Sequence, residues 1–99
     1  MKELYKLHAE MCKVFSSPTR LEILNLLRDK ELSVTELIER TELSQANISQ
    51  HLSIMKSKGI VASDRKGKNI YYKLTNAKII KAFDIIREVL AERLRNRMM

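Results

Sequence analysis

Residues 33–55, SVTELIERTELSQANISQHLSIM, contain two helix starts separated by a short turn at residues 41–43. The first start is a capping box, because the Ser33 hydroxyl and the Glu36 carboxylate can each accept a hydrogen bond from the other residue's backbone N–H. The second start is Ser44, a residue type whose side-chain oxygen satisfies a free backbone donor at a helix N-terminus. The stretch therefore predicts two short helices that follow one another across a turn.

The helix that begins at Ser44 is predicted to run to about Lys58, where Gly59 supplies the permissive residue that commonly follows a helix. Its apolar residues recur at helical spacing on one side: Ile48, Leu52 and Met55. We therefore expect this side to pack on the core and the opposite side to face solvent.

Apolar residues at helical spacing predict two more helices before this pair. The first covers about residues 3–15. Its apolar face consists of Leu4, Leu7, Met11, Val14 and Phe15. The second begins after Ser17, with Pro18 as its first residue, and runs to about Asp29. Its apolar residues cover a broad face, so we expect it at the centre of the core.

From Ile60 onward, apolar residues recur at every second position, which is the period of a half-buried strand. The two alternating runs are Ile60 and Ala62, and then Ile70, Tyr72 and Leu74. Between them lies RKGKN, residues 65–69, which is basic and contains a glycine. This pattern predicts a β-hairpin with a basic tip.

A last helix follows the hairpin, with Thr75 or Asn76 as its N-cap. At 100° per residue, the apolar side chains between Ile79 and Leu94 spread over about 220° of its circumference, well beyond the ~100° stripe that packing on one core requires. Because two-fold dimers are the commonest homo-oligomers, we expect a second copy to cover the surplus face, with the first helix taking part. The predicted dimer interface contains Leu4, Leu7, Met11, Phe83, Ile86, Val89 and Leu90.

The chain has 99 residues, the size of one small domain. We expect residues 1–99 to form a single winged helix-turn-helix domain, mainly α with a β-hairpin wing, in the order of four helices, two strands and a last helix. The sequence shows no signal peptide, no apolar run long enough to span a bilayer, and no second cysteine to pair with Cys12. We therefore expect a cytoplasmic protein without a membrane partner.

The 19 Lys and Arg residues exceed the 12 Asp and Glu residues, which gives a formal net charge of +7. Residues 65–99 carry ten basic and three acidic side chains and so hold the whole excess. A basic balance of this size favours a polyanionic partner.

The helix from Ser44 has no charged residue as far as Met55, although 31% of the chain is charged. Amides and hydroxyls suit the donor and acceptor pattern of base edges in the major groove. We predict base reading by Gln45, Asn47, Ser49 and Gln50. We predict phosphate or wing contacts for Ser44, His51, Lys56, Arg65, Lys66, Lys68 and Asn69. For His51, packing between helices is the alternative.

These segments together resemble the ArsR/SmtB family of small dimeric winged-helix repressors, over about residues 12–90. The resemblance is carried by FSSPTRLEIL (15–24), LSQANISQHL (43–52), KGIV (58–61) and YYKL (71–74). It implies a homodimer on an operator with dyad symmetry, repression by occlusion of the promoter, and release of DNA by an inducer.

The family's metal-sensing sites do not transfer to this sequence. Its arsenic and lead sensors carry the box Glu-Leu-Cys-Val-Cys-Asp-Leu, whereas residues 31–37 here read ELSVTEL. Its zinc sensors place His ligands on the last helix, and residues 75–99 contain no His. His8 and Cys12, four residues apart on the first helix, are the only candidates for a thiol or metal switch. The alternative is that Cys12 is a small buried hydrophobe.

The turn at residues 41–43 has Glu42 where such turns often have glycine. A left-handed backbone there would cost a non-glycine residue about 1 kcal/mol. The sequence therefore leaves the geometry of this turn open.

Double-stranded DNA is the predicted partner, and the main alternative is a winged-helix protein-interaction module, since a fold alone does not fix function. RNA is disfavoured because two Phe and three Tyr offer few stacking platforms. An enzyme is disfavoured because the sequence shows neither a nucleophile-base pair nor a phosphate-binding glycine loop. No cofactor is expected, and the sequence specifies neither an operator nor an effector.

Overall fold

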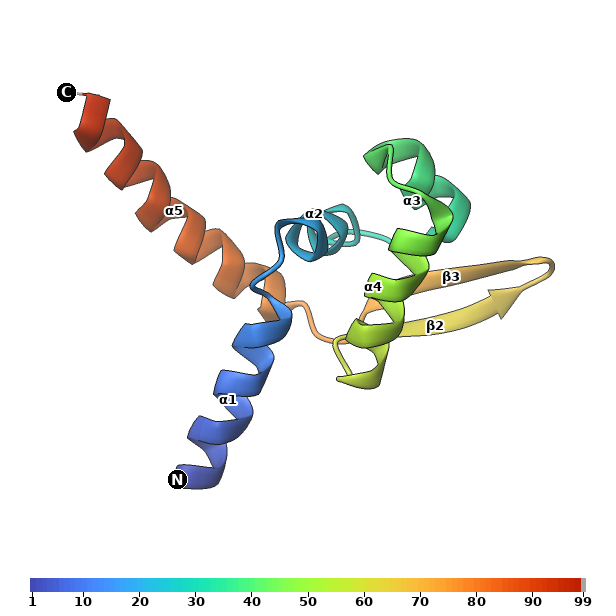
Figure 1. Ribbon diagram of the computed structural model, residues 1–99, viewed down its shortest axis with the longest axis horizontal. Coiled ribbons are helices and arrows are strands. Elements are labelled where there is room, and N and C mark those ends of the chain that lie inside the picture. Colours follow the sequence, from blue (N-terminus) through green and yellow to red (C-terminus); the bar gives the residue numbers. More distant parts are fainter. Residues whose placement is uncertain (99) are drawn as a thin grey trace.

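The computed structural model of the protein describes residues 1–98, so Met99, the last residue of the predicted domain, lies outside the described part. The elements follow one another as α1 (Lys2–Val14), α2 (Pro18–Leu26), β1 (Leu32–Ser33), α3 (Val34–Thr41), α4 (Gln45–Ser57), β2 (Val61–Lys66), β3 (Asn69–Leu74) and α5 (Lys78–Met98). Figure 1 shows a body formed by residues 18–74, from which α1 and α5 extend as two arms. The predicted fold class, mainly α with a hairpin wing, is confirmed.

The three predicted serine N-caps are confirmed. The hydroxyl oxygens of Ser17, Ser33 and Ser44 each accept a hydrogen bond from the backbone N–H three residues later, at 3.3, 3.1 and 3.1 Å. The capping box at Ser33 is closed in both directions, because its backbone N–H donates to the Glu36 carboxylate at 3.1 Å. These bonds hold the pKa of Glu36 below its ordinary value. The caps fix the residues at which α2, α3 and α4 begin.

Helix α2 is shorter than predicted, since it ends at Leu26 and not near Asp29. The backbone N–H groups of Leu27 and Arg28 donate to carbonyls three residues back, which tightens the last turn and closes the helix. The chain then turns toward β1.

The joint between the hairpin and α5 uses both predicted caps in different ways. The Asn76 side-chain oxygen accepts a hydrogen bond from the Lys78 backbone N–H at 2.9 Å, so Asn76 caps the helix. The Thr75 hydroxyl instead donates to the carbonyl oxygens of Gly59 and Ile60, at 2.6 and 3.0 Å. Thr75 therefore fastens the start of α5 to the turn that follows α4.

The predicted hairpin is confirmed, with a shift in which residues face the core. Strands β2 and β3 pair in antiparallel register, Val61 opposite Leu74 and Ser63 opposite Tyr72. Residues opposite one another share a face, so Val61, and not Ala62, joins Leu74 on the inner side. The reason is that Ile60 belongs to the turn after α4, where its backbone N–H donates to the Met55 carbonyl oxygen.

A third strand, β1, was not predicted. Its two residues, Leu32 and Ser33, pair with Tyr72 and Tyr71 of β3, which gives the strand order β1-β3-β2. Both β1 residues are buried. A two-residue strand is too short to show a period in the sequence.

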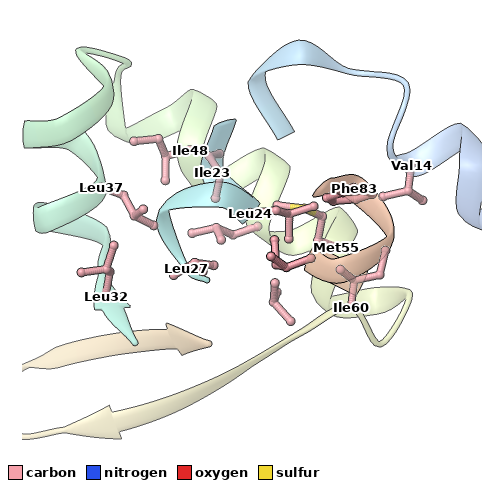
Figure 2. Packing of buried hydrophobic residues seen from close by; sticks show 13 residues of the cluster. Val14, Ile23, Leu24, Leu27, Leu32, Leu37, Ile48, Met55, Ile60 and Phe83 are labelled. Carbon is pink, nitrogen blue, oxygen red and sulfur yellow. The ribbon is translucent and has the colours of Figure 1, made fainter. Parts of the chain in front are cut away.

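The core lies within the body and extends to the inner ends of both arms (Figure 2). It consists of Val14, Ile23, Leu24, Leu27, Leu32, Leu37, Ile48, Leu52, Met55, Ile60, Val61, Ile80 and Phe83. Figure 2 shows Leu32 and Leu37 at one end of this cluster and Val14, Ile60 and Phe83 at the other. Among the helices described over residues 1–98, none has a stretch long and apolar enough to cross a membrane.

Candidate nucleic-acid interface

Helix α4 presents one buried side and one exposed side. Ile48, Leu52 and Met55 are completely buried and fix the helix on α3 and the hairpin. The predicted base-reading residues all lie on the exposed side: Gln45, Asn47, Ser49 and Gln50. The Ser44 hydroxyl caps this helix by accepting from the Asn47 backbone N–H. The structure therefore brings the four predicted readers together on one solvent-facing surface.

The turn that orients α4 against α3 contains a left-handed residue. Glu42 has φ 61° and ψ 15°, and its backbone N–H donates to the Ile38 carbonyl oxygen at 3.0 Å. The Thr41 hydroxyl donates to the Leu37 carbonyl oxygen and accepts from the Leu43 N–H, at 2.7 and 3.3 Å. This conformation costs a non-glycine residue roughly 1–2 kcal/mol. The turn geometry that the sequence left open is thus left-handed, and packing on either side holds it there.

The wing projects from the body as a two-stranded ribbon (Figure 1). Gly67, with φ +64°, is the first of the two residues between the paired ends Lys66 and Asn69, as tight hairpin turns require. The predicted wing residues are all exposed: Arg65, Lys66, Lys68 and Asn69. The tip therefore carries three positive charges within four residues.

A polar hollow of about 240 Å³ connects the wing to α4. Gln45 of α4, Lys68 and Asn69 of the wing and Thr35 of α3 line it. The structure thus places one predicted base reader and two predicted wing contacts around the same space.

Two of the predicted phosphate-binding lysines have partners within the chain. Lys66 forms an ion pair with Glu31, and its ammonium lies 5.6 Å from the centre of the Tyr71 ring. The hydrogen bond to Glu31 raises the pKa of Lys66 above its ordinary value. The Lys56 ammonium donates to the Ser63 hydroxyl at 2.6 Å. Phosphate binding by Lys66 would therefore compete with Glu31.

His51 takes part in a contact between helices. Its Nδ1 accepts a hydrogen bond from Arg20 Nε at 3.1 Å, and the same guanidinium donates to the Val14 carbonyl oxygen at 3.2 Å. A ring nitrogen that accepts carries no proton, so His51 is neutral with its proton on Nε2. Burial, and secondly the charge of Arg20, lower the pKa of His51. The packing role that the sequence left as an alternative is present, and Nε2–H remains a donor.

Six of the seven predicted dimer residues lie exposed on the arms. Leu4, Leu7, Met11, Ile86, Val89 and Leu90 are between 41% and 60% exposed. Phe83 is the exception, at 8%, because its ring packs edge-on against Phe15 at 4.8 Å between centres. In the single chain Phe83 thus belongs to the core, and its place in the dimer interface stays a prediction. The exposed apolar set also includes Ile85 and Leu94, which were not in the predicted interface.

The two candidate switch residues, His8 and Cys12, both line an apolar cavity of about 490 Å³ between the arms. Cys12 is exposed in the single chain, so the expectation that it is a buried hydrophobe is wrong there. Over residues 1–98, no three His, Cys, Asp or Glu side chains gather closely enough to hold a metal ion.

Three side-chain contacts between distant residues near these sites were missed by sequence reasoning: Arg20 with His51, Glu31 with Lys66, and Arg28 with Asp84. Each joins residues at least 31 positions apart. Helical spacing cannot reveal such pairs, because it relates only neighbours three or four positions apart.

The segment of this chain that matches a known protein family corresponds to successive elements of the fold. Residues 17–63, from the cap of α2 into β2, match the family model described as bacterial regulatory protein, arsR family. Rv0081 of Mycobacterium tuberculosis, an HTH-type transcriptional regulator, is 36% identical over 96 residues, which cover 96% of this chain and 84% of the relative. The crystal structure of Rv0081 has a TM-score of 0.86 and covers 97% of each chain.

Two other similar proteins are a repressor and a homodimeric DNA-binding domain. The transcriptional repressor PagR of Bacillus anthracis is 40% identical over 72 residues, or 72% of each chain. The homodimeric winged helix-turn-helix DNA-binding domain Mb0332 of Mycobacterium bovis has a TM-score of 0.84 at 27% identity and covers 96% of this chain and 88% of that one. Because the family model, a relative that matches 96% of this chain and the fold agree, this chain belongs to the ArsR family of winged helix-turn-helix transcriptional regulators, which are DNA-binding proteins and not enzymes.

Proposed function

We propose that this protein is a homodimeric repressor that binds a dyad-symmetric operator, with α4 of each protomer in the major groove of one half-site. The observation that carries the proposal is the exposed side of α4 between Gln45 and Met55, which has no charged residue, next to a wing tip with three basic residues. PagR is named a transcriptional repressor and Mb0332 a homodimer, and both likenesses support the proposal.

Base reading falls to the exposed amides and hydroxyl of α4. Asn and Gln pair bidentately with adenine N6 and N7, whereas Arg, the commonest reader of guanine, is absent between Ser44 and Met55. The directly read positions of each half-site should therefore favour A·T pairs. The readers are Gln45, Asn47, Ser49 and Gln50.

We assign the phosphate contacts to the wing and to residues of α4 and its N-cap. Lys68 and Asn69 line the polar hollow beside Gln45, so both can reach the backbone next to the bases that Gln45 reads. Arg65, Lys56, Ser44 and the Nε2–H of His51 complete the set. Lys66 joins it when phosphate displaces Glu31.

Dimerisation through α1 and α5 supplies the second half-site. The exposed apolar residues of the arms form a surface that a second copy would bury, and a two-fold dimer spaces the half-site centres by about one helical turn, roughly 34 Å.

Release of DNA is proposed to be independent of zinc, arsenite and lead. Ser33 and Thr35 occupy the segment in which thiolates would be needed, and the Ser33 hydroxyl is already engaged in capping α3. Addition of each ion at stoichiometric concentration should leave DNA bound. Release that disappears in Cys12→Ser would instead make the thiol a sensor.

The test begins with selection of bound duplexes from a random pool. Binding of Gln50→Ala and Lys68→Ala is then titrated on the selected and on random DNA at several salt concentrations. Gln50→Ala should cost about 1–3 kcal/mol on the selected site and little on random DNA. Lys68→Ala should weaken binding to both and lower the salt slope by about one.

The matched control is Lys81→Ala, which removes the same charge from an exposed site on α5 and should leave the salt slope unchanged. Equal losses for Gln50→Ala on both DNAs would remove α4 as the reader. Failure of the wild type to select any sequence at moderate salt would favour a protein-interaction module.

A further inference from the structure

Four polar side chains fasten the end of α2 to the second and third turns of α5. The Arg28 guanidinium donates to both carboxylate oxygens of Asp84, at 3.0 and 2.8 Å. It also donates twice to the Asn25 side-chain oxygen, at 3.1 and 2.7 Å. Arg87 donates to the same Asn25 oxygen at 3.2 Å. We call Asn25, Arg28, Asp84 and Arg87 the α2–α5 clamp.

The clamp is an ordered contact at a partly exposed place. The side chains of Arg28 and Asp84 are 31% and 42% exposed. The hydrogen bond from Arg28 lowers the pKa of Asp84, so the carboxylate is ionised at neutral pH. Exposed ion pairs contribute little to folding stability, but a bidentate guanidinium–carboxylate pair fixes the relative orientation of its two partners.

Few other contacts determine the direction of α5. Of its described side chains, only Ile80 and Phe83 are buried, and the apolar residues from Ile85 to Leu94 are exposed. Apolar contacts have little directional preference. Beyond the Thr75 hydrogen bonds at the start of α5, the clamp is therefore the directional contact between this arm and the helix-turn-helix.

The clamp and part of the apolar surface of α5 lie on different sides of the helix. At 100° per residue, Ile85 and Val89 lie about 100° or more from Asp84 and Arg87, whereas Leu90 lies about 60° from Arg87. Arg87 and Leu90 line the same hollow. The clamp can thus hold α5 on the body while the side with Ile85 and Val89 remains free for a second copy.

We infer that the α2–α5 clamp sets the distance between the two recognition helices of the dimer, and hence the half-site spacing that the protein accepts. This inference rests on the proposed function. About 21 Å of helix extend from Asp84 to the end of α5, at 1.5 Å per residue. A tilt of about 10° at the clamp moves that end by roughly 3.7 Å, about one base-pair step of 3.4 Å.

The clamp residues are positioning residues, because they lie in α5 and at the end of α2 and not on the exposed side of α4. Their removal should leave the recognition of each half-site intact and change only the tolerated spacing. A merely structural role would instead weaken binding equally at every spacing.

The experiment uses full-length dimer and the operator selected by the wild type, together with versions whose half-sites are one and two base pairs closer or farther apart. We expect Asp84→Ala to lower the preference for the selected spacing over the shifted ones by about 3- to 30-fold. Sedimentation and thermal unfolding establish that the variant remains a folded dimer, and Asp84→Asn, which retains one acceptor, provides a second variant.

A double-mutant cycle tests whether Arg28 and Asp84 act through their contact with each other. Arg28→Ala should change the spacing preference as Asp84→Ala does, and the double variant should change it no further, because both remove the same contact. The matched control is Glu92→Ala, which removes a carboxylate from the same helix at an exposed site. An unchanged spacing preference in Asp84→Ala and Asp84→Asn, or an equal change in Glu92→Ala, would overturn the inference.

The two proposals fail in different ways. If the wild type selects no pair of half-sites, the proposed function fails and the inference falls with it. If the wild type selects a spacing that the clamp variants share, only the inference fails.

Discussion

The body and the arms bury their apolar residues differently. Within residues 18–74, the large aliphatic side chains are mostly buried, and nine core residues are less than 2% exposed. On α1 and α5, by contrast, side chains of the same kind are half exposed along most of each helix. The body is therefore completed by its own chain, whereas the arms have exposed apolar surface, which we propose is covered by a second copy.

This difference separates two properties of the sequence, namely the folding of the helix-turn-helix and the association of two copies. Burial in the body determines whether the helix-turn-helix folds, and in the proposed dimer burial on the arms determines whether two copies stay together. Only the inner ends of the arms belong to both, since Val14, Ile80 and Phe83 enter the core. Substitutions should accordingly fall into two classes, according to which region they affect.

The largest effect is expected for truncation of a core residue in the body. Leu52→Ala should lower the free energy of unfolding by about 2–5 kcal/mol, because Leu52 is completely buried and leaves a cavity. Urea unfolding at a fixed protein concentration measures this loss. The neighbouring exposed Ser53→Ala should stay within about 0.5 kcal/mol of the wild type. A loss below about 1 kcal/mol for Leu52→Ala would contradict a self-completed body.

A charge on an arm should separate the copies without unfolding the body. Ile86→Glu should raise the dimer dissociation constant at least about 30-fold, since it buries an unpaired carboxylate in the interface. Sedimentation over a concentration series measures this change. Ile70→Glu, at an isoleucine that is 40% exposed in the wing, should leave the dimer intact. The same substitution at Phe83 would disturb the core and so would not separate the two properties.

Sequence patterns predicted the body well because its elements are marked by local signals. The caps at Ser17, Ser33 and Ser44 act within three residues, and the apolar side of α4 repeats at helical spacing. The exposed amides of α4 and the basic wing tip were found in the same way. Their positions follow from helix and hairpin geometry alone.

The features that the sequence did not predict depend on contacts between distant segments. Strand β1 exists because Leu32 pairs with Tyr72, forty positions later. Phe83 is in the core because Phe15 is close to it, and Lys66 is paired because Glu31 approaches the wing. These contacts cannot be predicted from local periodicity, because each requires the folded body to be in place.

A substitution in the turn between α3 and α4 measures the strain that the body holds at Glu42. Glu42→Gly should raise the free energy of unfolding by about 1 kcal/mol, because glycine adopts a positive φ without strain. Glu39→Gly, three residues earlier inside α3, should lower it by about 1 kcal/mol. Thermal and urea unfolding of the pair compare identical changes of side chain. A loss of stability in Glu42→Gly would mean that the carboxylate has a role which outweighs the relief of strain.

The smallest expected effect lies at the seam between the two regions, where Arg20 holds both His51 of α4 and the carbonyl of Val14 at the end of α1. The pKa of His51 is lowered in the folded chain, first by burial and then by Arg20. The unfolded chain therefore binds a proton more readily than the folded one as pH falls through about 6.5. Stability should be unaffected above that pH and should decrease below it.

His51→Gln should flatten this decrease between about pH 6.5 and 5, because an amide can still accept from Arg20 but does not titrate. The carboxylates with lowered pKa values, Glu36 and Asp84, act only at lower pH, below their ordinary values. Urea unfolding across this range measures the slope. An unchanged slope in His51→Gln would show that protonation of His51 is not linked to folding at this seam.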